Sequence, residues 1–256
     1  MHRQILLSGT LVTLGMIGLW EFLVRIFEVP SYLLPLPSAV IVEIMERSSL
    51  YANAALSTLW GVLLGFLLAG VLGILLGTAI VYSWLMRSTL YPLVLVFQVI
   101  PKIAIAPILI IWVGYGIELK ATVAMVIALF PVVISTVVGL NSVERELLDL
   151  VRVLGGSRFK EFVKISFPHA MPFIFSGLKV SITFAVIGAV VAEFITGNTG
   201  LGYLIIVANT EVNTSMAFAA LICLSAIGII LFAAAAGMEK LIVPWQPERE
   251  STNFTT

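Results

Sequence analysis

The sequence is poor in charge. Only 11% of its 256 residues are Asp, Glu, Lys or Arg, and its mean hydropathy is +1.12; a soluble domain carries about a quarter charged residues. No charged residue stands between Arg47 and Arg87, or between Glu211 and Glu239. A bilayer-spanning helix needs about 20 mostly apolar residues, and both gaps are longer than that. The composition therefore excludes an ordinary soluble protein and predicts an integral membrane protein.

Other shortages exclude further classes. Basic and acidic residues number 14 each, so the chain has no net charge to attract nucleic acid. The only cysteine, Cys223, can form no internal disulfide and is expected to be a small packed side chain. His2 and His169 are far apart, and no cluster has metal-ligand spacing. A glycine-rich phosphate loop ending in Lys-Ser or Lys-Thr is also lacking. The chain is therefore expected not to be an enzyme and to use no cofactor or metal of its own.

What the sequence has instead is apolar stretches long enough to cross a bilayer. They cover residues 5–27, 58–82, 90–113, 120–140, 174–196 and 215–237. The first stretch resembles a signal peptide, but it runs on through Trp20 and Glu21 without a small-residue cleavage site and is expected to be retained. The prediction is an all-α integral membrane fold with six transmembrane helices in a single transmembrane domain, residues 1–256.

The distribution of Lys and Arg predicts the orientation of these spans, because such residues gather on the cytoplasmic side. With the N-terminus in the cytoplasm, the inner side holds Arg3, Arg87, Arg145, Arg152, Arg158, Lys160, Lys164, Lys179, Lys240 and Arg249. The outer side then holds only Arg25, Arg47 and Lys120. We therefore expect both termini in the cytoplasm, together with the segment between the fourth and fifth spans, residues 141–173.

The second span carries a small residue at every fourth position, namely Gly61, Gly65, Ala69, Gly73 and Gly77. Small residues at this spacing let helix backbones approach closely in lipid. The stripe predicts tight packing inside one subunit or, as an alternative, an interface between subunits.

The third span contains Pro92, Pro101 and Pro107, each of which removes a backbone donor and is expected to bend the helix. Gln98 and Lys102 lie one turn apart around Pro101. An ammonium group inside a membrane is costly unless it faces a polar cavity, so we expect these two residues beside the translocation pathway. The alternative is that Lys102 extends to the interface or pairs with a carbonyl.

Glu193 is a third candidate for the pathway, near the outer end of the fifth span. The glycine-rich stretch TGNTGLGY follows it. Its carboxylate is expected either to bond the backbone of that turn or to form a contact at an outer gate.

Residues 141–173, the charged insert, contain the stretch DLVRVLGGSRFKEFVKISFP. A helix is predicted over residues 141–154, with Asn141 and Glu144 as a capping box or Ser142 as the cap instead. An apolar stripe at helical spacing consists of Val143, Leu147, Leu150, Val151 and Leu154.

The two glycines that follow, Gly155 and Gly156, are expected to end this helix. Ser157 can then cap a second short helix, which Pro168 and Pro172 are expected to end. Such an element could lie on anionic lipid, pack under its own bundle or dock in a groove of a cytosolic partner. Its mixture of acids and bases argues against lipid binding alone, which favours an unbroken basic face.

The charged insert resembles the cytoplasmic loop of ABC importer membrane subunits. That loop carries the pattern Glu-Ala-Ala, three residues, Gly, nine residues, then Ile-x-Leu-Pro. Here Asp149-Leu150-Val151 occupy the Glu-Ala-Ala positions and Gly155 is the glycine. Ile165-Ser166-Phe167-Pro168 match the end of the pattern, and the spacing is kept. Asp replaces Glu, Leu-Val replaces Ala-Ala, and Phe replaces Leu. By this resemblance, the residues that couple to an ATPase are Asp149, Leu150, Val151, Arg152, Gly155, Gly156, Ser157, Ile165 and Pro168.

Three further stretches are similar to the branch of this family that carries nitrate, taurine, alkanesulfonates and vitamin precursors: SYLLPLPSAV, FQVIPKIAIAPILIIWVGYGIELK and AEFITGNTGLGYLI. The resemblance implies a type I ABC importer permease in a bacterial inner membrane, working as a dimer, here expected to be a homodimer. Two cytosolic ATPase subunits would bind the ATP, and an external binding protein would deliver the solute.

The solute itself stays open at this level. Lys102 would suit a sulfonate, taurine or nitrate anion, whereas the lack of other charges along the pathway favours a thiamine-pyrimidine or riboflavin-like precursor. The alternative function is an ATP-independent channel or secondary transporter, in which Lys102 and Glu193 would be ion or proton sites.

Overall fold

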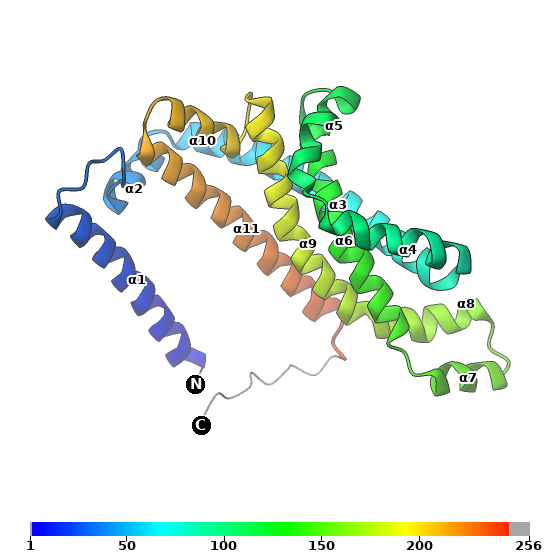
Figure 1. Cartoon of the computed structure of the whole chain (residues 1–256). Coiled ribbons are helices and arrows are strands. Elements are labelled where there is room, and N and C mark those ends of the chain that lie inside the picture. Colours follow the sequence, from blue (N-terminus) through cyan, green and yellow to red (C-terminus); the bar gives the residue numbers. More distant parts are fainter. Residues whose placement is uncertain (1, 246–256) are drawn as a thin grey trace. The chain divides into compact units, whose positions relative to one another are not determined.

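The computed structural model describes residues 2–245, and the side chains from residue 11 onward. Every regular element in this part of the chain is a helix, which confirms the all-α class (Figure 1). The elements are α1 (His2–Ile26), α2 (Pro37–Glu46), α3 (Ser48–Tyr82), α4 (Trp84–Val99), the 3₁₀ turn η1 (Lys102–Ile105), α5 (Ala106–Val113), α6 (Ile117–Asn141), α7 (Arg145–Val153), α8 (Arg158–Glu161), the π-helical turn η2 (Phe162–Ser166), α9 (Phe167–Thr196), α10 (Leu201–Thr210) and α11 (Thr214–Ile242).

Among the described residues, four stretches are long and apolar enough to cross a membrane: α3, α6, α11, and the run from α8 to the end of α9. A fifth is obtained if α4 and the following η1–α5 segment, bent by 95°, count as one span. The first predicted span falls in α1, whose first side chains are not described, so the number six stays a prediction. Of the cations counted on the inner side, Arg249 lies outside the described residues, and only the backbone of Arg3 is described.

The chain forms two compact units, and the division falls inside α3, α9 and α11. Unit 1 consists of Met1–Leu59 and Glu193–Ile227, and unit 2 of Trp60–Ala192 and Gly228–Thr256. The prediction of a single transmembrane domain stays a prediction.

The core of unit 2 is built on the stripe of small residues in α3, which packs against α6 of the same chain. A Cβ added to Gly65 would stand 2.4 Å from the Cβ of Ala124, and one added to Gly77 would stand 2.7 Å from the Cβ of Thr136. Ala69 is fully buried in the same cluster. The contact therefore lies within one subunit, as the first of the two interpretations predicted. Later residues of α3 contact later residues of α6, so the two helices run parallel.

Helix α9 packs on α6 in the opposite direction. Gly188 of α9 lies against Ala124 of α6, and Ala170 of α9 lies against Gly139 of α6, so residue numbers increase along α9 as they decrease along α6. The hydroxyl of Ser181 donates to the carbonyl of Ala128 at 2.8 Å inside this contact. Because α3 and α6 are parallel, the chain between them must return to the side on which α3 began. The bent segment formed by α4, η1 and α5 makes that return.

The prolines of this returning segment do not act alike. Pro101 lies at the break, as the N-cap of η1. Pro92 stays inside α4, and Pro107 lies in the first turn of α5, where no intrahelical donor is lost. The expectation that all three bend the span is therefore wrong for Pro107, and the break is placed by Pro101.

The close α3–α6 contact gives a prediction about stability. Gly65→Ala should lower the midpoint of thermal unfolding of the detergent-purified protein, because the new methyl would meet both Ala124 and the Ala121 carbonyl oxygen, 2.7 Å away. Such overpacking costs about 1–3 kcal/mol. Gly70→Ala is the matched control, since its methyl would touch only the Cδ2 of Leu178 at an ordinary 3.4 Å. Equal midpoints for the two variants would show that the contact is not tight.

In unit 1, carboxylates on long helices accept hydrogen bonds from the free N–H groups in the first turns of short helices. The N-cap of α2 is Leu36, which has no side chain able to bond the free N–H groups of the first turn. Glu21 of α1 does so instead, accepting from the Ser38 N–H at 3.1 Å and from its hydroxyl at 2.9 Å. The rings of Trp20 and Phe218 lie 5.5 Å apart between α1 and α11.

Candidate functional site

The charged insert forms a hairpin of α7 and α8 at the junction of α6 and α9 (Figure 1). Helix α7 ends at the glycine pair, as predicted, in a Schellman motif, in which a left-handed residue and two backbone hydrogen bonds close the helix. The Gly155 N–H donates to the Arg152 carbonyl at 3.0 Å, and the Gly156 N–H donates to the Val151 carbonyl at 2.8 Å.

The two glycines are needed for different reasons. Gly155 has a φ of +76°, which L side chains adopt only under strain, although the space around it is open. Gly156 has an ordinary φ, but a Cβ there would lie 2.3 Å from Cγ1 of Val151. Backbone conformation therefore requires the first glycine, and close packing requires the second.

The start of the insert differs from the prediction. Asn141 is the last residue of α6, and its amide donates to the Val137 carbonyl at 2.8 Å. Ser142 likewise bonds back to the Gly139 carbonyl. Helix α7 begins only at Arg145, with Glu144 as an N-cap that makes no side-chain bond. The capping box over residues 141–144 is therefore wrong, because α6 continues through its first position.

The second half of the insert also differs. Ser157 caps α8 as predicted, accepting from the Lys160 N–H at 3.3 Å. However, Pro168 and Pro172 do not end this helix, because it runs through η2 directly into α9. Proline cannot supply an N–H and crowds the carbonyl four residues earlier. Just before Pro168 the helix widens into a π-helical turn, in which the Phe167 N–H donates to the Phe162 carbonyl five residues earlier. Ile165 and Pro168 are half-buried in this wide turn and in the start of α9.

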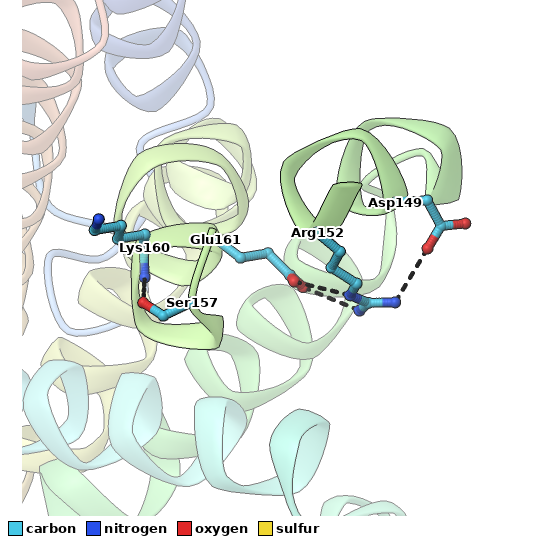
Figure 2. A network of polar contacts seen from close by, with 5 residues as sticks. All are labelled: Asp149, Arg152, Ser157, Lys160 and Glu161. Atoms are coloured by element: carbon cyan, nitrogen blue, oxygen red, sulfur yellow. Dashed lines mark hydrogen bonds and ion pairs between the residues drawn. The ribbon is translucent and has the colours of Figure 1, made fainter. Parts of the chain in front are cut away.

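A charge network joins the two arms of the hairpin, with Arg152 between two acids (Figure 2). Its Nε and Nη2 donate to the two oxygens of Glu161, at 3.2 and 3.3 Å, and its Nη1 donates to Asp149 at 3.1 Å. The hydrogen bonds and charge of Glu161 raise the pKa of the Arg152 guanidinium above its usual value, with a smaller contribution from Asp149. Since Glu161 is buried, this forked pair fixes α7 against α8.

The apolar stripe of α7 is largely uncovered by the chain. Val143 is buried, but Leu147, Leu150 and Leu154 keep 42, 54 and 76% of their surface exposed. Phe159 on α8 is 74% exposed as well. Among the three expected roles of the insert, packing under its own bundle therefore leaves most of this surface unexplained.

The structure separates the three candidate pathway residues into two places. In unit 2, the ammonium of Lys102 lies 3.4 Å from the Gln98 carbonyl oxygen and 4.7 Å from the centre of the Phe130 ring. Pro101 leaves carbonyls at the end of α4 without helical partners, and a cation there is favourable. This is the carbonyl pairing given as the alternative for Lys102, while the Gln98 side chain is exposed.

Glu193 lies in unit 1, where its side chain is fully buried. Its Oε2 accepts from the Gly202 N–H at 2.8 Å. Its Oε1 accepts from the Thr58 hydroxyl at 2.8 Å, and that hydroxyl accepts from the Leu201 N–H at 2.9 Å. The carboxylate thus satisfies the first two N–H groups of α10, one directly and one through Thr58. This is the backbone-bonding role expected for Glu193; a role at the pathway stays a prediction.

Sequence reasoning missed two residues of these sites. Glu161 is the only acid between Asp149 and Glu193, so its place among Arg152, Arg158, Lys160 and Lys164 was a signal for an internal ion pair. Thr58 gave no such signal, because a threonine at the start of an apolar span is an ordinary helix residue. Only the approach of α9 and α10 to α3 reveals its role.

Comparison with known proteins agrees with this architecture. Residues 48–244 match the family described as "Binding-protein-dependent transport system inner membrane component". The chain belongs to this family and is a transmembrane permease of ABC importers. No similar protein supports the alternative of an autonomous channel or secondary transporter.

Two relatives are similar over nearly their whole length. The chain is 34% identical to the formylaminopyrimidine transport permease protein ThiX of Halalkalibacterium halodurans, covering 95% of this chain and 97% of the relative. It is 34% identical to the riboflavin transport system permease protein RibX of Chloroflexus aurantiacus, covering 89% and 85%. The solved MetNI methionine ABC transporter matches with a TM-score of 0.64 at 16% identity, covering 77% of this chain and 98% of that one, which supports the fold.

Proposed function

We propose that α7 is the coupling helix through which a separate cytosolic ATPase drives this permease. The observation that carries the proposal is the uncovered apolar stripe of α7, with Leu147, Leu150 and Leu154 exposed. An apolar surface of this kind on a charged insert is typical of a docking site. Helix α7 holds two acids and two bases, Arg145, Glu146, Asp149 and Arg152, so it lacks the basic face that lipid binding favours.

Asp149 is the charged contact in this proposal. Its side chain is 68% exposed and one of its oxygens already pairs with Arg152. The carboxylate is therefore oriented without being covered, and a basic residue in the cleft of the ATPase could approach it. The fork between Arg152 and Glu161 makes the hairpin stiff, so that movement of the docked α7 would be passed through η2 into α9.

The working assembly follows from family membership. Two copies of the chain would form the translocation pathway, with two ATPase subunits on the cytoplasmic side and a binding protein on the other. Both termini and the charged insert would be cytoplasmic, in agreement with the excess of Lys and Arg on that side. In unit 2, α6 and α9 run in opposite directions and α3 runs parallel to α6, so the insert lies at the end of the α6–α9 pair at which α3 also finishes.

For the solute, we propose a small uncharged heteroaromatic compound of the vitamin-precursor type. The relatives named for formylaminopyrimidine and riboflavin are both 34% identical and cover 95% and 89% of this chain, whereas a nitrate import permease of Synechocystis reaches 34% over only 73% of it. Lys102, a cation proposed to lie beside the pathway, is held by a carbonyl and an aromatic ring within the chain. An anion would therefore have to compete for it.

A charge reversal tests the coupling proposal. Asp149→Lys should leave the membrane helices folded but weaken the docking of α7 on the ATPase and reduce solute uptake into proteoliposomes about tenfold or more, since like charges facing each other across an interface cost several kcal/mol. Glu144→Lys makes the same charge change at an exposed position before α7 and should keep uptake near the wild-type level. Normal uptake by a correctly folded Asp149→Lys variant, or failure of any ATPase to co-purify with the wild type, would contradict the proposal.

A further inference from the structure

Unit 1 contains a cleft with mainly apolar walls and several polar side chains, which the functions above do not use. It has a volume of about 220 Å³ and lies between the first turns of α3 and the turn that precedes α10. Five polar side chains line it: Asn53, Ser57, Asn198, Thr199 and Tyr203. Leu50 and Leu204 supply apolar wall, and none of the described residues lining it is charged.

The start of α10, beside this cleft, would ordinarily attract an anion, because free N–H groups and the helix dipole both favour negative charge there. In this protein Glu193 already occupies that position. It takes the Gly202 N–H directly and the Leu201 N–H through Thr58. The anion-binding capacity of α10 is therefore used within the chain.

The carboxylate of Glu193 also lies immediately behind the wall of the cleft. Gly200 lines the cleft, and a Cβ added to it would stand 1.9 Å from Oε1 of Glu193. Only the backbone of one glycine thus separates the cleft from a buried negative charge. A second anion at that distance is repelled, and in a partly buried site this lowers affinity by about tenfold or more.

We propose that this cleft is a solute-contacting site of the permease, which accepts a small uncharged single-ring heteroaromatic compound and rejects anions through Glu193. The inference rests on the proposed transport function and adds to it a place and a basis for selection. Asn53 and Asn198 carry amides that can match ring nitrogens and exocyclic amines with both donors and acceptors. Tyr203 offers an aromatic face. The volume is below the roughly 300 Å³ at which pockets for drug-sized ligands begin, so it suits one ring better than a fused tricycle.

The test is ligand-observed saturation-transfer NMR on the full permease–ATPase complex in nanodiscs, without ATP or binding protein. The probes are 4-aminopyrimidine and benzenesulfonate, which are single rings that differ in charge. The wild type should bind 4-aminopyrimidine, and its affinity for benzenesulfonate should be lower by about tenfold or more. Asn53→Leu should weaken 4-aminopyrimidine binding about tenfold, because an amide that bonds the ring is lost. Asn209→Leu, at the exposed far end of α10, should not change it.

Two further variants test the role of charge. Glu193→Gln keeps the shape of the buried side chain and should raise benzenesulfonate binding. Asn198→Lys places a cation at an exposed lining position, where folding is not at risk, and should raise it as well.

Three results would each overturn the inference: no binding of 4-aminopyrimidine, equal binding of both probes by the wild type, or equal effects of Asn53→Leu and Asn209→Leu. Because no ATP turnover is measured, these results are independent of coupling. Absence of a co-purifying ATPase would instead reject the proposed function.

Discussion

Gly155→Pro is expected to abolish solute uptake while the membrane helices stay folded. Proline holds φ near −65°, whereas Gly155 adopts +76° and donates its N–H to the Arg152 carbonyl. The end of α7 would have to be rebuilt at a cost of about 3 kcal/mol or more. The turn lies in the exposed hairpin, away from the buried contacts among α3, α6 and α9, so the damage should stay local.

A graded series at this position separates backbone conformation from side-chain size. Gly155→Asn should be nearly normal, because asparagine tolerates left-handed backbone. Gly155→Ala should be intermediate, with a strain of about 1–2 kcal/mol, since nothing lies within 4 Å of its added methyl. The measurement is uptake into proteoliposomes that contain the permease and its ATPase, with ATP hydrolysis recorded in parallel.

Gly228→Ala serves as the control, because it too would add a methyl in open space but at ordinary helical φ in α11. Uptake should fall in the order Asn, Ala, Pro while ATP hydrolysis persists. Normal uptake by the proline variant would show that the glycine turn does not transmit force.

The largest effect on stability is expected from Gly200→Ala. Its added methyl would overlap Oε1 of Glu193, so the buried carboxylate would have to leave Thr58 and the Gly202 N–H. Each buried group left unsatisfied costs about 1–3 kcal/mol. The backbone at Gly200, with φ +109° and ψ 172°, is also a conformation that is essentially restricted to glycine, which adds about 1–3 kcal/mol of strain.

Gly197→Ala provides the matched comparison three residues earlier. Gly197 also has positive φ, +60°, but no atom lies within 4 Å of an added methyl. It should therefore lower stability only by about 1–2 kcal/mol of backbone strain. Thermal unfolding of the detergent-purified protein should show a much lower midpoint for Gly200→Ala than for Gly197→Ala. Similar midpoints would mean that the Glu193 contact does not hold α10 in place.

The local structure of the charged insert was well predicted wherever the signal came from single residues. Gly155 and Gly156 end α7, and Ser157 caps α8, because a left-handed turn and a hydroxyl cap are properties of the residues themselves. The capping box at Asn141 failed because a neighbouring helix competed for the same residue. The partner of Arg152 could not be chosen from the sequence, since Glu161 meets it only after the chain has folded back.

The sequence by itself determined the membrane class, the helical architecture and the turn at Gly155 and Gly156. Apolar length, missing N–H groups and permitted φ values belong to each residue regardless of its neighbours. The tertiary structure alone decided that the α3 stripe meets α6, that Lys102 lies over the Phe130 ring and that Glu193 bonds to Thr58 and to the start of α10. These contacts depend on how each helix is rotated and placed along its neighbour. Packing sets that rotation, because many similar apolar faces could pair and only the combined fit of all of them selects one register.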